Sequence, residues 1–367
     1  MKLMKSLATV LLLSMLQTIT QAELLIGQTV GVSGAVAATV KESMLGAKLC
    51  VDAANAKGGI YGEKLNILTL DDKFDTKLTL ANAKTLIEER QVLALFMTRG
   101  TPHTQGILPL LDQYAVPLIG PSTGAMLFHQ PIQPHVFNVR AAYQREAEKA
   151  ITHLASIGIT RIALVHVDDS FGADALNGAQ KGLTVNKLTP VMLAKFDRNK
   201  PDFSAIAPQV IQANAQAVMV IGSGTAVVQG IQQIKSAGSG AQFITLSNNA
   251  SEGFIQLLGA QGRGVIVTQV FPQSFNYALV KEASQLAKSQ GIGLVSPAML
   301  EGFASAKVLV EALRRSGPKP TREKLQAALE NFRMDIGGLD VIYDKTSHTG
   351  LDFADLSIIT ADGKFRR

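Results

Sequence analysis

The sequence has 367 residues, a formal net charge of +6 and a single cysteine. Its basic residues are scattered, tryptophan is absent and tyrosine is scarce, so we expect no nucleic-acid-binding surface. One cysteine excludes an intramolecular disulfide, and a chain of this length buries enough surface to fold without one. The length favours two domains.

The first 22 residues predict a cleaved secretory signal. Lys2 and Lys5 precede the apolar run Leu7–Leu16, and the sequence TQA at 20–22 forms a small-x-small cleavage site. The apolar run is shorter than the roughly 20 residues that span a bilayer. No cysteine follows the site, which argues against a lipid anchor. We expect a mature chain that begins at Glu23 and is exported to the periplasm.

Past the signal, short apolar runs alternate with helical patterns. The first series predicts strands at Leu24–Val30, Leu65–Asp71, Val92–Met97 and Val116–Gly120, and helices at Lys41–Ala56, Thr76–Arg90 and His103–Tyr114. The second series predicts helices at Glu146–Ile157, Ala173–Leu183, Phe203–Ala213 and Ala226–Ala237, and strands at Arg161–Val167, Val191–Phe196, Ala217–Ile221 and Gln242–Leu246. Such alternation is typical of parallel sheets covered on both faces. We therefore predict an α/β fold of two doubly wound parallel-sheet lobes.

The last hundred residues break this rhythm. They predict a strand at Val265–Val270, helices at Tyr277–Gln290, Pro297–Arg315 and Thr321–Asn331, and hairpins in GGLDVIYD and LSIITADGKF. If these helices return to the first sheet, neither lobe is built from one continuous stretch. No linker separates the two series, which favours several short crossovers over one flexible joint.

Small polar groups follow most of the predicted strands. In open parallel sheets, ligands bind beyond the carboxyl ends of the strands. Thr101 and the pair Ser122-Thr123 stand where helices begin, so free N–H groups and positive helix ends face the cleft there. That arrangement suits a carboxylate. The alternative is that these hydroxyls only cap helices.

Enzyme motifs are missing from the sequence. The glycines of GQTVGVSG have the wrong spacing for a dinucleotide site, and neither a P-loop nor a G-x-S-x-G turn occurs. The six histidines lack metal-ligand spacing, and the acid pairs Asp71-Asp72 and Asp168-Asp169 more often cap helices than bind cations. We predict no catalytic residues, no cofactor and no metal site.

Several longer segments resemble one family. The segments IGQTVGVSGAVA, GGIYG before a strand that ends in two aspartates, PLLDQYAVPLIGPSTGA and the D-S-F-G turn are similar to extracellular solute-binding proteins of the branched-chain amino-acid type, the type I periplasmic receptors of ABC importers. The resemblance implies three crossovers, a hinged cleft and delivery to an inner-membrane permease. It assigns 23–140 plus 271–345 to an N-terminal lobe and 141–270 plus 346–367 to a C-terminal lobe.

The resemblance also implies ligand contacts in the first lobe. Thr101 matches the hydroxyl residue that takes the ligand carboxylate, and Ser122 and Thr123 match the segment after the fourth strand. Gly124 stands where threonine is common.

In the second lobe the match is partial. Phe171 stands where a tyrosine usually packs on the ligand. The family's acidic partner of an α-ammonium is replaced by Ser247, Asn248 and Asn249. We therefore expect a small carboxylate or amide with an apolar body more than a free amino acid, unless one of the paired aspartates takes the missing acid's place.

The resulting hypothesis is a monomeric periplasmic binding protein, not an enzyme, that carries a small carboxylate or amino acid to an ABC permease. Two alternatives stay open. One is a ligand-sensing receptor subunit of the same fold, and the other is an exported α/β enzyme.

Overall fold

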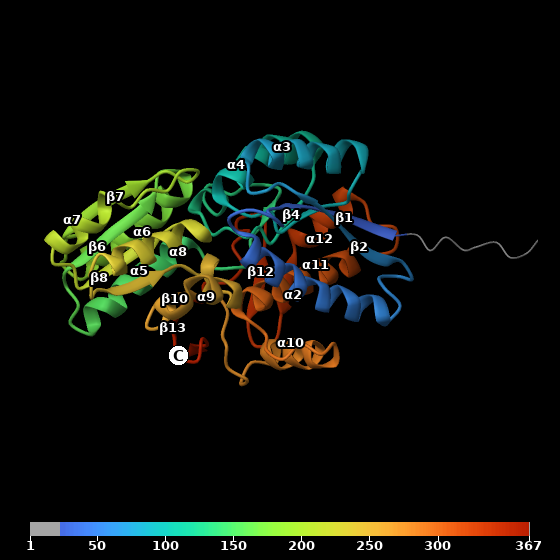
Figure 1. Ribbon diagram of the computed structural model, residues 1–367. Helices are drawn as coiled ribbons and strands as arrows, with labels where there is room; N and C mark the ends of the chain where they lie inside the picture. The colour runs from blue at the N-terminus through green and yellow to red at the C-terminus, as the bar shows by residue number, and fades with distance from the viewer. Residues whose placement is uncertain (1–22, 367) are drawn as a thin grey trace, which may run out of the picture.

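The computed structural model describes residues 23–366, which form two lobes side by side (Figure 1). One lobe is blue and teal with orange-red helices, and the other is mostly green to yellow. The predicted signal lies outside the described residues.

The first sheet has the strand order β2-β1-β3-β4-β5, with all neighbours parallel. Alternate residues of a strand face opposite sides: Ile26 and Phe96 pack with α2 and α11, whereas Leu95 packs with α3 and α4. The strands are β1 Glu23–Val30, β2 Lys64–Asp71, β3 Leu95–Phe96, β4 Leu118–Ile119 and β5 Val136–Phe137. The intervening helices are α2 Ala37–Ala56, α3 Thr76–Lys84, the π-helical turn η2 Thr85–Glu89, α4 Thr101–Tyr114 and the 3₁₀ turn η3 Met126–Phe128.

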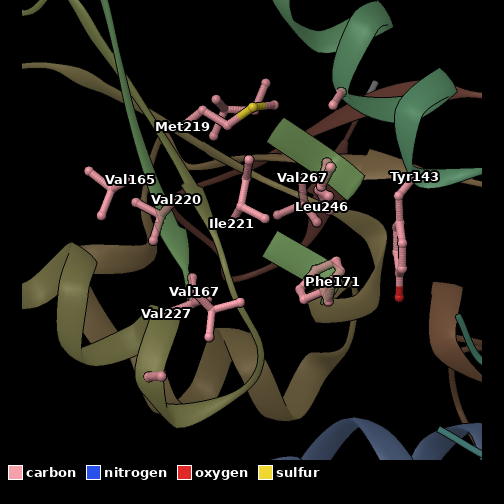
Figure 2. Packing of buried hydrophobic residues seen from close by; sticks show 14 of the residues in the cluster. Tyr143, Val165, Val167, Phe171, Met219, Val220, Ile221, Val227, Leu246 and Val267 are labelled. Carbon is pink, nitrogen blue, oxygen red and sulfur yellow. The ribbon is translucent and has the colours of Figure 1, made fainter. Parts of the chain in front are cut away.

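The second sheet has the order β14-β13-β10-β9-β8-β6-β7, in which only β13 runs antiparallel to the other strands. Valines and other apolar side chains of neighbouring strands meet in its core (Figure 2). The strands are β6 Ile162–Val167, β7 Met192–Phe196, β8 Ala217–Ile221, β9 Gln242–Thr245, β10 Ile266–Gln269, β13 Asp355–Ile359 and β14 Phe365–Arg366. The helices are α5 Tyr143–Ser156, α6 Ser170–Val185, α7 Ile206–Gln212, α8 Thr225–Ser236, η4 Ser247–Asn249, α9 Glu252–Leu258 and η5 Gly259–Gly262.

The tail returns to the first lobe before it ends in the second. Leu279, Phe303 and Leu325 join the core that contains Ile26. The elements concerned are α10 Ala278–Ser289, α11 Pro297–Arg315, α12 Arg322–Leu329 and the hairpin of β11 Phe332–Asp335 with β12 Asp340–Tyr343. The chain thus passes between the lobes at 138–142, 270–277 and 344–354. The predicted α/β fold with three crossovers is confirmed.

Two predicted strands are shorter than expected. β3 ends at Phe96 because Met97 has a φ of 50°, and β4 ends at Ile119 because Gly120 has a φ of 58°. Positive φ angles turn the chain out of extended conformation. Both turns lead directly into the polar segments that the sequence singled out.

Helices α2 and α11 lie in contact through two glycines. A Cβ at Gly46 would lie 1.8 Å from the carbonyl oxygen of Met299, and a Cβ at Gly302 would lie 1.8 Å from that of Ser43. Only residues without a side chain allow this backbone approach. The contact fixes α11, which carries a residue of the candidate site described below.

Gly46→Ala should therefore lower the free energy of unfolding by about 1–3 kcal/mol, since the helices must move apart to admit the methyl group. Urea unfolding of the mature chain measures it. Gly106→Ala is the matched control, because Gly106 lies inside α4 and a Cβ added there would meet no atom within 4 Å. Alanine at this position should stabilise the protein by about 0.5–1 kcal/mol. Equal losses in both variants would contradict the close-contact explanation.

Candidate ligand-binding site

The first-lobe residues predicted from the sequence lie together. Gly100, with a φ of 94°, turns the chain from the end of β3 into α4, whose first residue is Thr101. The Thr101 and Thr123 hydroxyl oxygens are 2.8 Å apart. The Ser122 hydroxyl donates to Glu301 of α11 at 3.0 Å. The side chains of Thr101, Ser122, Thr123 and Glu301 are all buried.

Arg99 crosses from this group to the second lobe. Its Nη2 donates to the backbone oxygen of Asn248 at 2.5 Å, and its Nη1 donates to the Ser122 hydroxyl at 3.4 Å. The side chain is buried, and its Nε has no hydrogen-bond partner among the described residues. Burial lowers the pKa of Arg99, but a guanidinium stays protonated in proteins. A buried cation thus keeps one free donor between the lobes.

Neighbouring polar atoms share this lack of partners. The hydroxyl oxygens of Thr98 and Thr104 and the Oδ1 of Asn248 are buried and form no hydrogen bond within the described chain. Buried polar groups without partners are costly, and native proteins hold few of them. Their concentration beside Arg99 and Thr101 marks this region as a place for a polar molecule.

Ser247 and Asn248 are held by the second lobe. The Ser247 N–H donates to Glu146 at 3.0 Å, and its hydroxyl accepts from Arg140 at 2.7 Å. The Asn248 side-chain amide donates to the Gly222 carbonyl at 2.9 Å and to the Ser223 hydroxyl at 3.0 Å. Their backbones therefore have fixed positions opposite Arg99.

Gly124 and Phe171 have other surroundings. A Cβ at Gly124 would lie 2.6 Å from the Ala141 carbonyl, so this glycine allows the first crossover to pass close. Phe171 is buried in the core of the second lobe, with its ring 4.7 Å from that of Tyr143 (Figure 2). Both positions border the crossover rather than Thr101 itself.

A buried ion cluster lies at the first crossover. Arg140 pairs with Glu146 of α5 and lies 3.6 Å from Glu301 of α11. Glu146 also accepts from the Thr268 hydroxyl. Burial alone would lower the pKa of Arg140, but the charges of Glu146 and Glu301 outweigh it and raise the pKa. One guanidinium thus joins a carboxylate from each lobe.

The aspartates that follow the strands are all engaged within the protein. Asp72 is buried, which raises the pKa of its carboxyl, and Asp169 caps α6 through the N–H groups of its first turn. Their side-chain partners are Ser33 for Asp71, Thr29 and Thr79 for Asp72, Lys195 for Asp168 and Arg198 for Asp169. Each of these four aspartates thus already has a partner within the protein. None is free to act as the acidic partner of an α-ammonium, for which the sequence has no acidic residue after β9.

Sequence reasoning gave no role to Arg99, Arg140, Glu146 or Glu301. Arg99 lies within one of the polar segments that follow the predicted strands, so its place near the cleft could be predicted. Its contact with the second lobe could not. Glu301 lies 179 residues beyond the serine it binds, and no local pattern links them.

Two further observations bear on other functions. Within residues 23–366, no group of three or more histidine, cysteine, aspartate or glutamate side chains has the arrangement of a metal site. Over the same range, no helix has the length and apolarity needed to cross a bilayer.

Two sheet-based lobes, three crossovers and buried polar groups between them define a two-lobed binding protein. The chain matches the model of the family described as periplasmic binding protein over residues 23–360 and belongs to that family.

Known relatives agree with this assignment. The chain is 25% identical to the Leu/Ile/Val-binding protein of Escherichia coli K12 over 239 residues, 65% of each chain's length. It thus spans just under two thirds of that relative. A leucine-specific-binding protein of Salmonella typhimurium is 23% identical over 290 residues, 77% of each chain.

Solved structures match over nearly the whole chain. A substrate-binding periplasmic protein from Ralstonia solanacearum has 29% identity and a TM-score of 0.85, with 94% of this chain and 99% of that one covered. An ABC-transporter solute-binding protein from R. palustris in complex with benzoate has 15% identity and a TM-score of 0.84, covering 94% and 95%. The latter similarity is one of fold alone.

Glu146→Ala should lower the free energy of unfolding by about 3–5 kcal/mol, because it leaves Arg140 buried with one distant carboxylate. Chemical denaturation of the mature chain checks this. Glu148→Ala on the same helix serves as control, because Glu148 is half-buried and its side chain forms no ion pair with a described residue. It should cost no more than about 1 kcal/mol. A loss at Glu146 no larger than at Glu148 would show that the cluster does not stabilise the fold.

Proposed function

We propose that this chain is the periplasmic binding component of an ABC importer and that it binds a small carboxylate or amide with an apolar body. The observation that carries the proposal is the buried, partly unpartnered guanidinium of Arg99, held between Ser122 of one lobe and Asn248 of the other. A ligand that accepts a hydrogen bond there would lie where the two lobes meet.

The carboxylate is proposed to lie between Arg99 and the start of α4. Thr98 and Thr101 supply hydroxyls, and the first turn of α4 supplies free N–H groups and the positive end of the helix. Hydrogen bonds to a charged group contribute roughly 1.5–3 kcal/mol each. Thr123 orients the Thr101 hydroxyl through their shared hydrogen bond, and Ser122 orients Arg99 by accepting from its Nη1.

A plain carboxylate is favoured over an amino acid because an α-ammonium needs an acceptor when it loses water. Glu146 and Glu301 pair with Arg140, and the four aspartates have partners within the chain. The R. palustris complex with benzoate supports such a ligand in this fold. The relatives named for leucine, isoleucine and valine favour the amino-acid alternative.

Delivery is proposed to follow closure of two lobes, 23–140 plus 271–345 and 141–270 plus 346–367, about the three crossovers. Contacts such as the hydrogen bond from the Thr225 N–H to the Ala35 carbonyl, 3.1 Å, would form on closing. The ligand favours the closed form through its contacts with both lobes. A sensing receptor subunit would use the same motion, so the genes beside this one would separate transport from sensing.

A thermal-shift screen of the mature chain tests the ligand class. We expect aliphatic or aromatic monocarboxylates to raise the Tm, since a ligand at 100 times its Kd adds about 2.7 kcal/mol of stability. Thr101→Val should remove most of the shift, and Thr101→Ser, which keeps the hydroxyl, should retain it. A strong shift with leucine or valine and none with plain carboxylates would overturn the preference.

Closure itself is measured by solution X-ray scattering with and without a ligand from that screen. We expect a smaller radius of gyration at saturation, because hinge bending brings the lobes together. An unchanged scattering profile would contradict a hinged cleft whichever ligand is bound.

A further inference from the structure

A second feature between the lobes lies outside the carboxylate anchor. A pocket of about 240 Å³ is lined by Lys73 and Phe74 from the first lobe and by Arg198 and Ser223, among others, from the second. We call it the distal pocket. It opens where the segments after β2, β7 and β8 meet.

Both charged residues that line the distal pocket are cations. Lys73 and Arg198 are its charged lining residues, and no carboxylate lines it. Arg198 pairs with Asp169, which does not line the pocket. Lys73 forms no ion pair with any described residue. The guanidinium carbon of Arg198 also lies 4.9 Å from the centre of the Phe74 ring, which keeps the cation beside an apolar surface.

Two chains of side-chain contacts link the wall of the distal pocket to the anchor. On the first-lobe side, the Phe74 ring stacks on His103 at 4.2 Å, and His103 lies two residues after Thr101 in the first turn of α4. On the second-lobe side, Ser223 accepts a hydrogen bond from Asn248, whose backbone accepts from Arg99.

We infer that the distal pocket binds a second anionic group of the same ligand, so that the preferred substrate class is a dicarboxylate with a hydrocarbon body. This inference rests on the proposed function, because it places the first carboxylate at Arg99 and Thr101. The Phe74 ring and the Phe196 ring, both in the pocket wall, flank the body. The start of α8, where Thr225 and Ala226 line the pocket and Gly224 offers no capping side chain, adds the positive end of a helix.

Calorimetric titration of the mature chain tests the inference with straight-chain dicarboxylates from malonate to suberate, each paired with the monocarboxylate of equal length. At the length that fits, the dicarboxylate should bind about tenfold more tightly, a difference of about 1.4 kcal/mol. Added salt should reduce this preference, because the pocket is open to solvent and its charges are screened.

Lys73→Gln should weaken the dicarboxylate about fivefold and leave the monocarboxylate unchanged, as expected for one exposed ion pair. Lys64→Gln is the matched control, since Lys64 begins the strand, β2, whose far end leads to Lys73. Thr101→Val should weaken both ligands.

The two proposals fail differently. Equal affinity for both members of every pair, or a loss of both on Lys73→Gln, overturns the second anionic site and leaves the carboxylate anchor standing. Binding of leucine with no binding of any carboxylate overturns both.

Discussion

The guanidinium of Arg140 is buried at the first crossover, and its charge must be balanced there, because an unpaired buried ion costs several kcal/mol. The balance comes from Glu146 of α5 and Glu301 of α11, one carboxylate from each lobe. Each carboxylate also accepts from a group of the candidate site, the Ser247 N–H in one case and the Ser122 hydroxyl in the other. The charge that joins the lobes thus also positions the groups that face a ligand.

This arrangement places the first crossover, about which hinge motion is proposed, and the candidate site in one network. A movement of α5 relative to α11 changes the distances from Arg140 to its two carboxylates, and the serines bound to those carboxylates must follow. The glycine contact between α2 and α11 holds these two helices together within the first lobe, so in the proposed hinge motion Glu301 would stay with that lobe. Coupling of this kind needs no long pathway, since each step is a direct hydrogen bond or ion pair.

The sequence predicted what depends on local pattern. Alternating apolar runs gave the two parallel sheets, and small polar residues after β3 and β4 marked Thr101 and Ser122, which the structure brings together. It placed the ends of both strands one residue too late. The left-handed conformation of Met97 is not visible in its residue type, and Gly120, whose φ is also positive, was assigned to the strand. The reach of Arg99 to Asn248, 149 residues away, depends on the approach of the lobes, which no local signal encodes.

The charges between the lobes limit what can bind. Arg99 and Arg140 are matched in charge by Glu146 and Glu301, so these four buried groups are neutral as a set. They differ in how many of their hydrogen-bonding atoms already have partners. The carboxylates accept from Arg140, two hydroxyls and a backbone N–H. In contrast, the Nε of Arg99 has no partner within the described chain, and no side chain caps the start of α4. An ammonium would have to displace existing partners of Glu146 or Glu301 to find an acceptor. The carboxylate proposed above would find donors that have no partner within the described chain, and the positive end of α4 would favour its charge.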